Sequence, residues 1–346
     1  SISGATVSSL FGSNFSDATD NSSGSSANSF AGIAITGYTA DASKGTWQYT
    51  TDGSTWTSIG TVSDTSALTL GVGANDKLRF VPANNWNGTP PSLTVRLFDN
   101  SNGSVSSGAT SVNVSSNGDS TAISSGTVTL STSVTPVNDA PVASGSASLG
   151  AILEDTAASS ISGATVSSLF GSNFSDATDN VTSGSSANSF AGIAISSYTA
   201  DASKGTWQYS SNGSSWSDLS SISSATSALT LKNTDYLRFV PANNWNGSAP
   251  TLSVKLIDSS TSVTTAATVD ATGGGTTAYS DAAVTLSTTV NPVNDAPTLL
   301  SNTTSLAAIN EDNSSPSGDT VTNLFSNKFS DATDNVTSGS SANSFA

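Results

Sequence analysis

The chain has 346 residues and a formal net charge of −16, with 25 Asp and Glu against 9 Lys and Arg. This acidic excess argues against nucleic acid or an anionic membrane as a partner and suits hard cations. The sequence contains no Cys and no His, which excludes disulfides, thiolate or imidazole metal sites and a Ser-His-Asp triad. No apolar run reaches a membrane-spanning length and the start is not typical of a signal peptide, so we expect a segment of a longer exported protein.

An internal repeat of roughly 155–160 residues organises the chain. Three stretches return with little or no change: Ala5–Phe11 as Ala164–Phe170, Arg79–Gly88 as Arg238–Gly247, and Asp176–Ala191 as Asp331–Ala346. We therefore divide the chain into three parts. Repeat 1 (residues 1–138) lacks its opening strand, repeat 2 (residues 139–294) is complete, and residues 295–346 are the opening part of repeat 3.

Within each repeat the pattern is typical of β-structure, because short apolar runs alternate and no stretch keeps a helical period. Gly45–Trp56 predicts a hairpin in which Asp52-Gly53 supplies a turn with positive φ, and the second copy carries Asn212-Gly213 there. Further strands are expected at Ser66–Leu70, Lys77–Val81, Ser92–Asp99, Val105–Val114 and Thr127–Val134. The serine-rich segments Asp20–Ser29 and Ser115–Ser125 are expected to be exposed loops. Seven to nine strands per repeat with short turns predict an all-β fold of tandem antiparallel β-sandwiches.

The linkers between repeats are Pro136–Pro141 and Pro292–Pro297, which share one sequence. Two prolines bracket an acidic turn, so no strand can run through it and we interpret each copy as a hinge. A Glu-Asp pair follows each linker after about a dozen residues, as Glu154-Asp155 and Glu311-Asp312.

The recurring acidic residues predict a Ca²⁺ site. Glu occurs only at positions 154 and 311, and a Glu side chain can bind Ca²⁺ through both oxygens where Asp is too short. Two Asp three residues apart also follow a Phe in every repeat, and acidic groups gathered at one end of a sandwich repel unless a cation neutralises them. The predicted ligands are Asp17, Asp20, Asp139, Glu154, Asp155, Asp176, Asp179, Asp295, Glu311, Asp312, Asp331 and Asp334.

We group Glu154 with the linker residue Asp139 and the Asp176–Asp179 cluster of the same repeat. Asp99 and Asp258, each at the end of a strand, are reserve ligands. Turn formation and capping remain an alternative role for Asp139 and Asp295, since Asp and Asn are common in turns.

The tryptophans and the acidic pairs raise two other possibilities. All six Trp recur in pairs, and exposed aromatic side chains can stack on sugars, but we expect these six to pack in the core and anchor loops. Paired acids also occur in glycosidases. Each repeat has a single Glu in an opening strand beside the linker, however, and we predict no enzymatic activity.

Together these motifs resemble the bacterial cadherin-like tandem repeats of giant secreted surface proteins, including large repetitive adhesins of the RTX type. The resemblance rests on the Pro-Val-Asn-Asp-Ala-Pro linkers, the following Glu-Asp, Phe-Ser-Asp-x-x-Asp, and Leu-Arg-Phe-Val-Pro-x-x-Asn-Trp-Asn-Gly. It implies a cadherin- or immunoglobulin-like sandwich and a calcium-stiffened extender. It also implies that Asp139 and Asp295 are linker ligands and that Glu154 and Glu311 are opening ligands.

The Asp pairs depart from the family pattern by one residue. The resemblance implies that Asp17, Asp176 and Asp331 are the first Asp of the cadherin Asp-x-Asp motif. The second Asp of that motif is displaced to Asp20, Asp179 and Asp334.

The functional hypothesis is therefore a structural spacer that is secreted and lies at the cell surface or in an extracellular matrix. Its expected partners are neighbouring copies of the repeat, with no nucleic acid and no membrane insertion of this segment. One alternative is a filament subunit, in which a strand from a neighbouring chain completes repeat 1 or chains dock end to end. A second alternative is a carbohydrate-binding module that uses the tryptophans.

Overall fold

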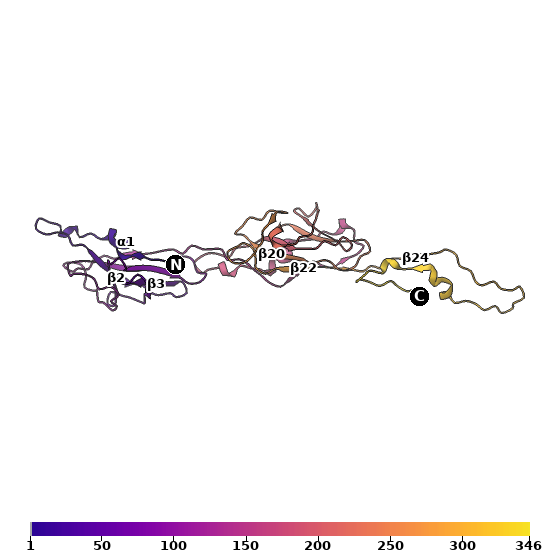
Figure 1. The fold of residues 1–346 in the computed structure, drawn as a ribbon, viewed down its shortest axis with the longest axis horizontal. Helices are drawn as coiled ribbons and strands as arrows, with labels where there is room; N and C mark the ends of the chain where they lie inside the picture. Colours follow the sequence, from indigo (N-terminus) through magenta and orange to yellow (C-terminus); the bar gives the residue numbers. More distant parts are fainter. Residues whose placement is uncertain (1) are drawn as a thin grey trace. The chain divides into compact units, whose positions relative to one another are not determined.

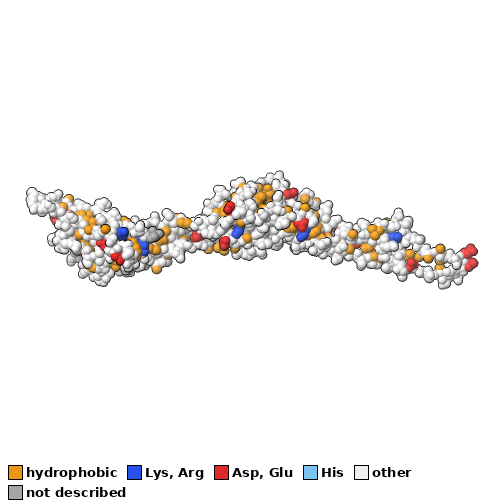
Figure 2. Space-filling model, viewed as in Figure 1, with side chains coloured by type: hydrophobic (Ala, Val, Ile, Leu, Met, Phe, Trp, Pro, Cys, Tyr) orange, Lys and Arg blue, Asp and Glu red, His pale blue; other side chains and the backbone are white. Residues whose placement is uncertain are grey.

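The computed structural model of the chain describes residues 2–346, which form two compact units (Figure 1). Unit 1 comprises the residues up to Val137 together with Thr178–Ala187, and unit 2 comprises Asn138–Ala177 and Asn188–Ala346. Among residues 2–346, no helix is both long enough and apolar enough to cross a membrane. Figure 2 shows one face, on which charged side chains are sparse and scattered, in keeping with a charged fraction of 10%.

Unit 1 is a sandwich of two four-stranded antiparallel sheets, ordered β1-β6-β3-β4 and β5-β2-β7-β8. Its strands are β1 (Ala5–Thr6), β2 (Phe30–Gly37), β3 (Gly45–Thr50), β4 (Thr57–Ser58), β5 (Leu68–Gly71), β6 (Lys77–Pro82), β7 (Leu93–Asp99) and β8 (Val128–Leu130). One-turn helical segments connect them: α1 (Val7–Phe11), η1 (Gly12–Asn14) and η2 (Ala18–Asp20).

Unit 2 repeats this architecture with additional strands. Its largest sheet has the order β10-β22-β20-β14-β17-β21, and a four-stranded sheet, β12-β18-β15-β16, corresponds to β1-β6-β3-β4 of unit 1. A three-stranded sheet (β11-β23-β19) and two strand pairs (β13-β9 and β24-β25) complete the unit.

The bounds of these elements follow the repeat closely. The strands are β9 (Val142–Ala143), β10 (Ser146–Ser148), β11 (Ile152–Leu153), β12 (Ala164–Thr165), β13 (Phe174–Ser175), β14 (Phe190–Ser197), β15 (Gly205–Ser210), β16 (Ser217–Asp218), β17 (Ala228–Lys232), β18 (Tyr236–Pro241), β19 (Gly247–Ser248), β20 (Leu252–Asp258), β21 (Thr268–Val269), β22 (Val284–Ser287), β23 (Thr289–Asn291), β24 (Thr298–Leu299) and β25 (Phe329–Ser330). The helical turns are η3 (Ala158–Ser160), α2 (Val166–Phe170), η4 (Gly171–Asn173), η5 (Ala177–Asp179), η6 (Ala225–Ser227), α3 (Val321–Phe325), η7 (Ser326–Lys328) and η8 (Ala332–Asp334).

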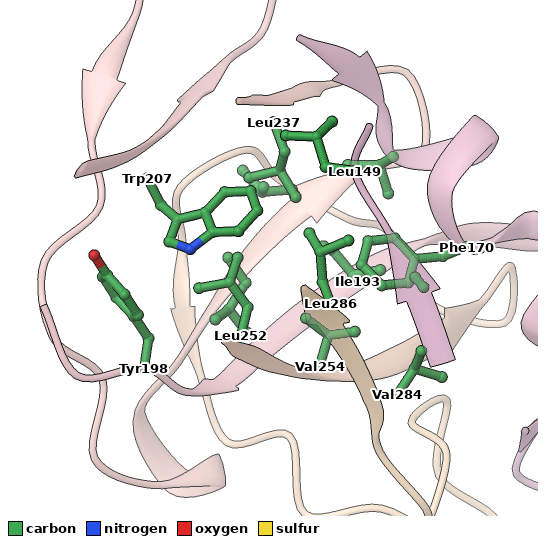
Figure 3. Close-up of a cluster of buried hydrophobic side chains, with 14 of the residues drawn as sticks. Leu149, Phe170, Ile193, Tyr198, Trp207, Leu237, Leu252, Val254, Val284 and Leu286 are labelled. Carbon is green, nitrogen blue, oxygen red and sulfur yellow. The ribbon is translucent and has the colours of Figure 1, made fainter. Parts of the chain in front are cut away.

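Apolar side chains of the two sheets meet in one core per unit. In unit 2 the core contains Trp207 and Leu286, both fully buried, and Figure 3 shows Leu149 directed into the same cluster beside Leu237. The indole nitrogen of Trp207 donates a hydrogen bond of 2.6 Å to the carbonyl oxygen of Pro250, which satisfies the one polar atom of that side chain.

Strand β2 is buried on both faces of its sheet. Alternation along the strand directs Ile33 and Ile35 into the main core, whereas Ala34 joins a second small cluster with Val114. Ile123 packs against this second cluster. Ser115–Ser125 was expected to be an exposed loop, and this is only partly right, because its apolar residues cover the outer face of the sheet.

The all-β sandwich prediction is confirmed, with two corrections. No strand forms over Val105–Val114 within the described residues; this segment makes one isolated bridge, between Val112 and Ala67, because its Gly and Ser residues turn the chain. The sandwich of unit 2 is also not purely antiparallel, since β10 pairs in parallel with β22 and β11 with β23.

Candidate metal-binding junction

The linker Pro292–Pro297 lies between strands and contains none itself. Strand β23 ends at Asn291, and β24 begins at Thr298. The same holds for the first linker, where the next strand, β9, begins at Val142. The prediction that prolines keep strands out of both linkers is confirmed, because proline supplies no backbone donor for a sheet. The backbone amides of the linker are therefore available to side chains from elsewhere.

Glu154 reaches this second linker from the start of repeat 2. Strands β10 and β11 run parallel to the closing strands β22 and β23, so the residue after β11 lies where β23 ends. The backbone nitrogen of Glu154 donates to the Asn291 carbonyl at 3.1 Å, and its Oε1 accepts from the Val293 nitrogen at 2.7 Å. The side chain is buried, with 5% exposure.

The grouping of Glu154 with Asp139 at the first linker is therefore wrong. An opening strand that pairs in parallel with the closing strand runs the length of the repeat and carries its far end to the opposite linker. Spacing in the sequence does not reveal this, since Glu154 follows the first linker by about a dozen residues.

The Asp pair of repeat 3 meets the same linker. The backbone nitrogen of Asp295 donates to Asp334 Oδ1 at 2.9 Å, and Asn343 donates its backbone N–H to Asp331 Oδ2 at 2.6 Å. The Asn343 amide also donates to Asp334 Oδ2 at 3.1 Å and to Asn294 Oδ1 at 3.0 Å. Asp331 and Asp334 are each 6% exposed, so the linker and the loop of repeat 3 enclose both carboxylates.

The neighbours of Asp295 do not compensate its negative charge. Its Oδ2 atom is buried and has no hydrogen-bond partner among the residues that the structure describes. Its pKa is raised above the usual Asp value, first by burial and then by the negative charges of Asp155, Asp334, Glu154 and Asp331. Every charged group that shifts this pKa is itself a carboxylate. A buried carboxylate oxygen facing like charges requires a cation or a proton to balance it.

The donor set of this junction fits Ca²⁺ in its chemistry. Carboxylate and amide oxygens are the ligands Ca²⁺ prefers, and a carboxylate left without a donor has a free lone pair. Within residues 2–346, however, no group of three or more acidic side chains has the arrangement of metal ligands. Several of the carboxylate oxygens accept N–H hydrogen bonds instead, which leaves Asp295 Oδ2 as the unsatisfied atom.

Asn246 joins the junction although the sequence analysis did not single it out. Its amide donates to Glu154 Oε2 at 3.0 Å and to Ser340 Oγ at 2.9 Å, and its Oδ1 accepts from the Ser340 nitrogen at 2.7 Å. Ser340 Oγ in turn donates to the Asp334 carbonyl at 2.6 Å. The sequence feature that points to Asn246 is the unchanged recurrence of Asn-Trp-Asn-Gly in both repeats.

The same loop-to-loop contact exists within unit 1. The Asn87 amide donates to Ser185 Oγ at 2.8 Å, its Oδ1 accepts from the Ser185 nitrogen at 2.7 Å, and Ser185 Oγ donates to the Asp179 carbonyl at 2.6 Å. Asp179 is buried. The contact is therefore a regular feature of the repeat and not an accident of one copy.

Around the first linker, unit 2 reproduces part of the same pattern. Asn188 donates its backbone N–H to Asp176 Oδ2 at 2.5 Å and its amide to Asn138 Oδ1 at 2.8 Å. The Asn138 amide lies 3.4 Å from Oδ2 of Asp258, which is completely buried at the end of β20. Asp258, a reserve ligand in the sequence analysis, is therefore brought to the linker, and Asp139 beside it is half-buried.

The remaining predicted residues lie in more open surroundings. Asp17 accepts a 2.7 Å hydrogen bond from the Asn28 nitrogen and is half-buried, whereas Asp20 is exposed. Their counterparts Asp331 and Asp334 are buried because a linker covers them. Glu311 and Asp312 lie in an exposed turn.

The tryptophans serve packing roles, as expected. Trp47 and Trp207 are core residues, and Trp86 and Trp245 pack edge-on against Phe80 and Phe239. The third pair is covered by arginine, since the Arg79 guanidinium lies 4.0 Å from the Trp56 ring centre and Arg238 lies 4.1 Å from that of Trp216.

Comparison with known proteins adds one distant structural likeness. The chain matches no protein-family profile and no curated protein. It is similar to the crystal structure of the CupB6 tip adhesin from Pseudomonas aeruginosa, with 9% sequence identity and a TM-score of 0.23 over 77% of this chain and 86% of that one.

Proposed function

We propose that this chain is part of an extracellular spacer whose repeats are locked together by Ca²⁺ at the linkers. The observation that carries the proposal is Asp295, whose buried Oδ2 lacks a donor while four other carboxylates raise its pKa. Glu154, Asp295, Asp331 and Asp334 would hold the ion. When bound, Ca²⁺ supplies the positive charge that this cluster lacks, at the millimolar levels typical of extracellular calcium modules.

The positions of these four residues explain how a bound Ca²⁺ would stiffen the linker. Glu154 belongs to repeat 2, Asp295 to the linker, and Asp331 and Asp334 to repeat 3, so three consecutive segments present carboxylates to one place. Without a cation the carboxylates repel one another, which opposes closure of the linker. A bound cation attracts each of the carboxylates and so favours closure. Near-identical repeats support the role of a spacer, because each added copy adds length, whereas one binding site would need only one copy.

The test compares the full chain in EDTA and in millimolar CaCl₂. We expect Ca²⁺ to raise the melting temperature of unit 2 and to narrow the range of particle dimensions seen by small-angle X-ray scattering. Ca²⁺ at 100 times its Kd would stabilise the folded state by about 2.7 kcal/mol. Identical melting and scattering in both buffers would refute the proposal.

Matched variants localise the effect. Asp295→Asn removes one negative charge at the junction, whereas Asp281→Asn removes one at an exposed site elsewhere in unit 2. We expect Asp295→Asn to lose most of the response to Ca²⁺ and Asp281→Asn to keep it. Equal responses would show that Ca²⁺ acts through the net charge and not through this junction.

A further inference from the structure

Beyond the spacer role, we propose that Asn246-Gly247 is a site of spontaneous covalent modification that the junction holds in check. While the loop contact between Asn246 and Ser340 is closed, the Asn246 side-chain amide is protected. When this contact opens, Asn246 deamidates, and the product disfavours closure. The identity of the dipeptide, the hydrogen bonds that hold it and the charge beside it all point to this site.

Deamidation meets little steric hindrance in an Asn-Gly pair. Glycine has no Cβ, so its backbone nitrogen can reach the side-chain carbonyl carbon of the preceding Asn. A bond forms between the Gly247 nitrogen and Asn246 Cγ, the bond from Cγ to Nδ2 breaks, and ammonia leaves with the proton of the Gly247 nitrogen. Water then opens the succinimide ring to give aspartate or isoaspartate. The reaction consumes water, releases ammonia and adds a carboxylate, and it needs no oxidant or reductant.

The Asn-Gly pairs of the chain lie in different surroundings. Asn246 is 2% exposed and its counterpart Asn87 is 8% exposed, whereas Asn102, in the turn after β7, is exposed. The other two pairs are Asn117-Gly118 and Asn212-Gly213. One chain therefore contains the same reactive dipeptide both buried in a loop contact and open to water, which provides an internal comparison.

The side chain of Asn246 is held at both of its polar atoms. Nδ2 donates to Glu154 Oε2 at 3.0 Å and to Ser340 Oγ at 2.9 Å, and Oδ1 accepts from the Ser340 nitrogen at 2.7 Å. These bonds keep the side chain in one rotamer, and burial keeps away the water that the reaction needs. Asn87 is held in the same way by Ser185.

The attacking nitrogen is held as well. In unit 1 the Gly88 nitrogen donates to the Val134 carbonyl at 2.9 Å, and in unit 2 Gly247 pairs with Val290 in the corresponding antiparallel arrangement. Sheet pairing fixes the peptide plane, so the nitrogen is not free to turn toward the Asn side chain. Deamidation at either site therefore requires local opening of the contact.

The geometry of the contact also requires glycine after the Asn. Gly88 and Gly247 have φ angles of +120° and +125°, which residues with a side chain rarely adopt. A Cβ on Gly88 would lie 2.8 Å from the Ser183 carbonyl oxygen, in the loop that approaches it. The fold thus imposes the reactive dipeptide, and the hydrogen bonds of the contact protect it.

Deamidation of Asn246 disfavours closure because of the charge beside it. Aspartate has no N–H to donate, and the oxygen that replaces Nδ2 would face Glu154 Oε2 at hydrogen-bond distance. Two carboxylates in this position repel each other. Isoaspartate also lengthens the backbone before Gly247, which shifts its pairing with Val290. The reaction involves no Ca²⁺, so it is tested in EDTA, separately from the spacer role.

The rate at each Asn-Gly pair tests the protection. The full chain is incubated in heavy-oxygen water with EDTA at mildly alkaline pH, and peptide mapping by mass spectrometry counts the label at each pair. The label distinguishes deamidation during incubation from deamidation during digestion. We expect Asn102 to react roughly tenfold or more faster than Asn246 and Asn87, which react only after local opening. In chain unfolded by urea the three rates should converge. Equal rates in the folded chain would overturn the proposal.

Two serine variants serve as controls for each other. Ser340→Ala removes a hydrogen-bond partner of Asn246, and Ser185→Ala removes the equivalent partner of Asn87. Each should speed deamidation severalfold at its own Asn and leave the other Asn and Asn102 unchanged. Unchanged deamidation of Asn246 in the Ser340→Ala chain, or equal acceleration at all three sites, would show that the contact does not protect.

Asn246→Asp reproduces one product and tests the effect on the junction. In EDTA its hydrogen exchange around Val293 and Ser340 should be faster than in Asn246→Ala, because Ala removes the amide without adding a charge. Exchange in Asn246→Asp that is equal to or slower than in Asn246→Ala would show that the new carboxylate does not oppose closure, and would overturn this part of the proposal.

Discussion

At the scale of single residues, buried polar side chains connect segments that are far apart in the sequence. Asn246 is the clearest case, because one amide bonds both Glu154 of the opening strand and Ser340 of the next repeat. It is 2% exposed, so water does not replace these bonds easily. Such a group stabilises mainly because removing it leaves its partners buried and unsatisfied.

We therefore expect Asn246→Ala to destabilise the 292–297 junction by about 1–3 kcal/mol, the cost of leaving buried polar groups unpaired. Asn243→Ala in the same loop is the control, since Asn243 is exposed. Hydrogen exchange of the segments around Val293 and Ser340 provides the measurement. Similar protection from exchange in both variants would show that the Asn246 side chain does not stabilise the junction.

The hairpin residue Asp52 allows a prediction about pH. Hydrogen bonds from Thr55, first from its hydroxyl and then from its backbone N–H, hold the pKa of Asp52 well below the usual Asp value, with further contributions from Ser54 and Thr50. A depressed pKa means that the folded hairpin binds the proton less tightly than the unfolded chain. Its stabilisation is therefore present above the ordinary Asp pKa of about 3.9 and is lost as pH falls toward the lower folded value.

Asp52→Asn should remove this pH dependence while keeping the hairpin. Asn212 already occupies the equivalent position and accepts from the Ser214 and Ser215 nitrogens, both at 2.9 Å. Carboxyl-carbon NMR titration of the natural chain should show Asp52 titrating below the ordinary Asp pKa of about 3.9. A titration midpoint for Asp52 at or above that ordinary value would contradict the prediction.

At the scale of elements, the two copies of the closing strand form an internal comparison. Strand β22 lies between β10 and β20, whereas β8 has β7 on one side only. The strands share the core residues Val and Leu at the same register, as shown by the pairs Leu93–Leu130 and Leu252–Leu286. Any difference in their contribution to stability therefore reflects the neighbouring strand and not the residue type.

Leu286→Ala should cost about 2–5 kcal/mol in unfolding free energy, the range for a fully buried Leu, because it leaves a cavity. Leu130→Ala should cost clearly less, since Leu130 is half-buried and borders an open groove. Urea denaturation of dilute full-length chain, with hydrogen exchange to assign each unit, measures both. Equal costs would indicate that the edge of β8 is already as well covered as β22.

At the scale of the whole molecule, two folded units are accompanied by a segment that is not part of a sheet. Residues 302–320 are exposed throughout, whereas the corresponding residues of repeat 2 include the buried Leu149, Glu154 and Ile161.

Limited proteolysis should therefore start in residues 302–320, because exposed backbone without sheet bonds enters a protease readily. Thermolysin has suitable cleavage sites at Leu306 and Ile309, and mass spectrometry of the first products locates the cut. A first cut inside either sandwich would contradict this.

The sequence by itself determined the features that depend on local chemistry and on repetition. Alternating β-branched and aromatic residues specify strands whatever their partners, and proline excludes strands from the linkers. Comparison of the copies identified the recurrent Asp pairs and the unique Glu positions. Asn246 lay in a motif known to recur, but its role depends on which side chains surround it.

Only the tertiary structure decided which acidic residues meet. Strand direction placed Glu154 at the second linker, because parallel pairing with the closing strand carries an opening strand across the repeat. Burial and the surrounding carboxylates then raised the pKa of Asp295, and both depend on which residues are its neighbours in space. Sheet edges are likewise a property of the fold, since the same Leu is buried at 286 and half-buried at 130 according to whether another strand pairs beside it. Local sequence specifies what a segment can form, and the partners available in three dimensions determine what it does form.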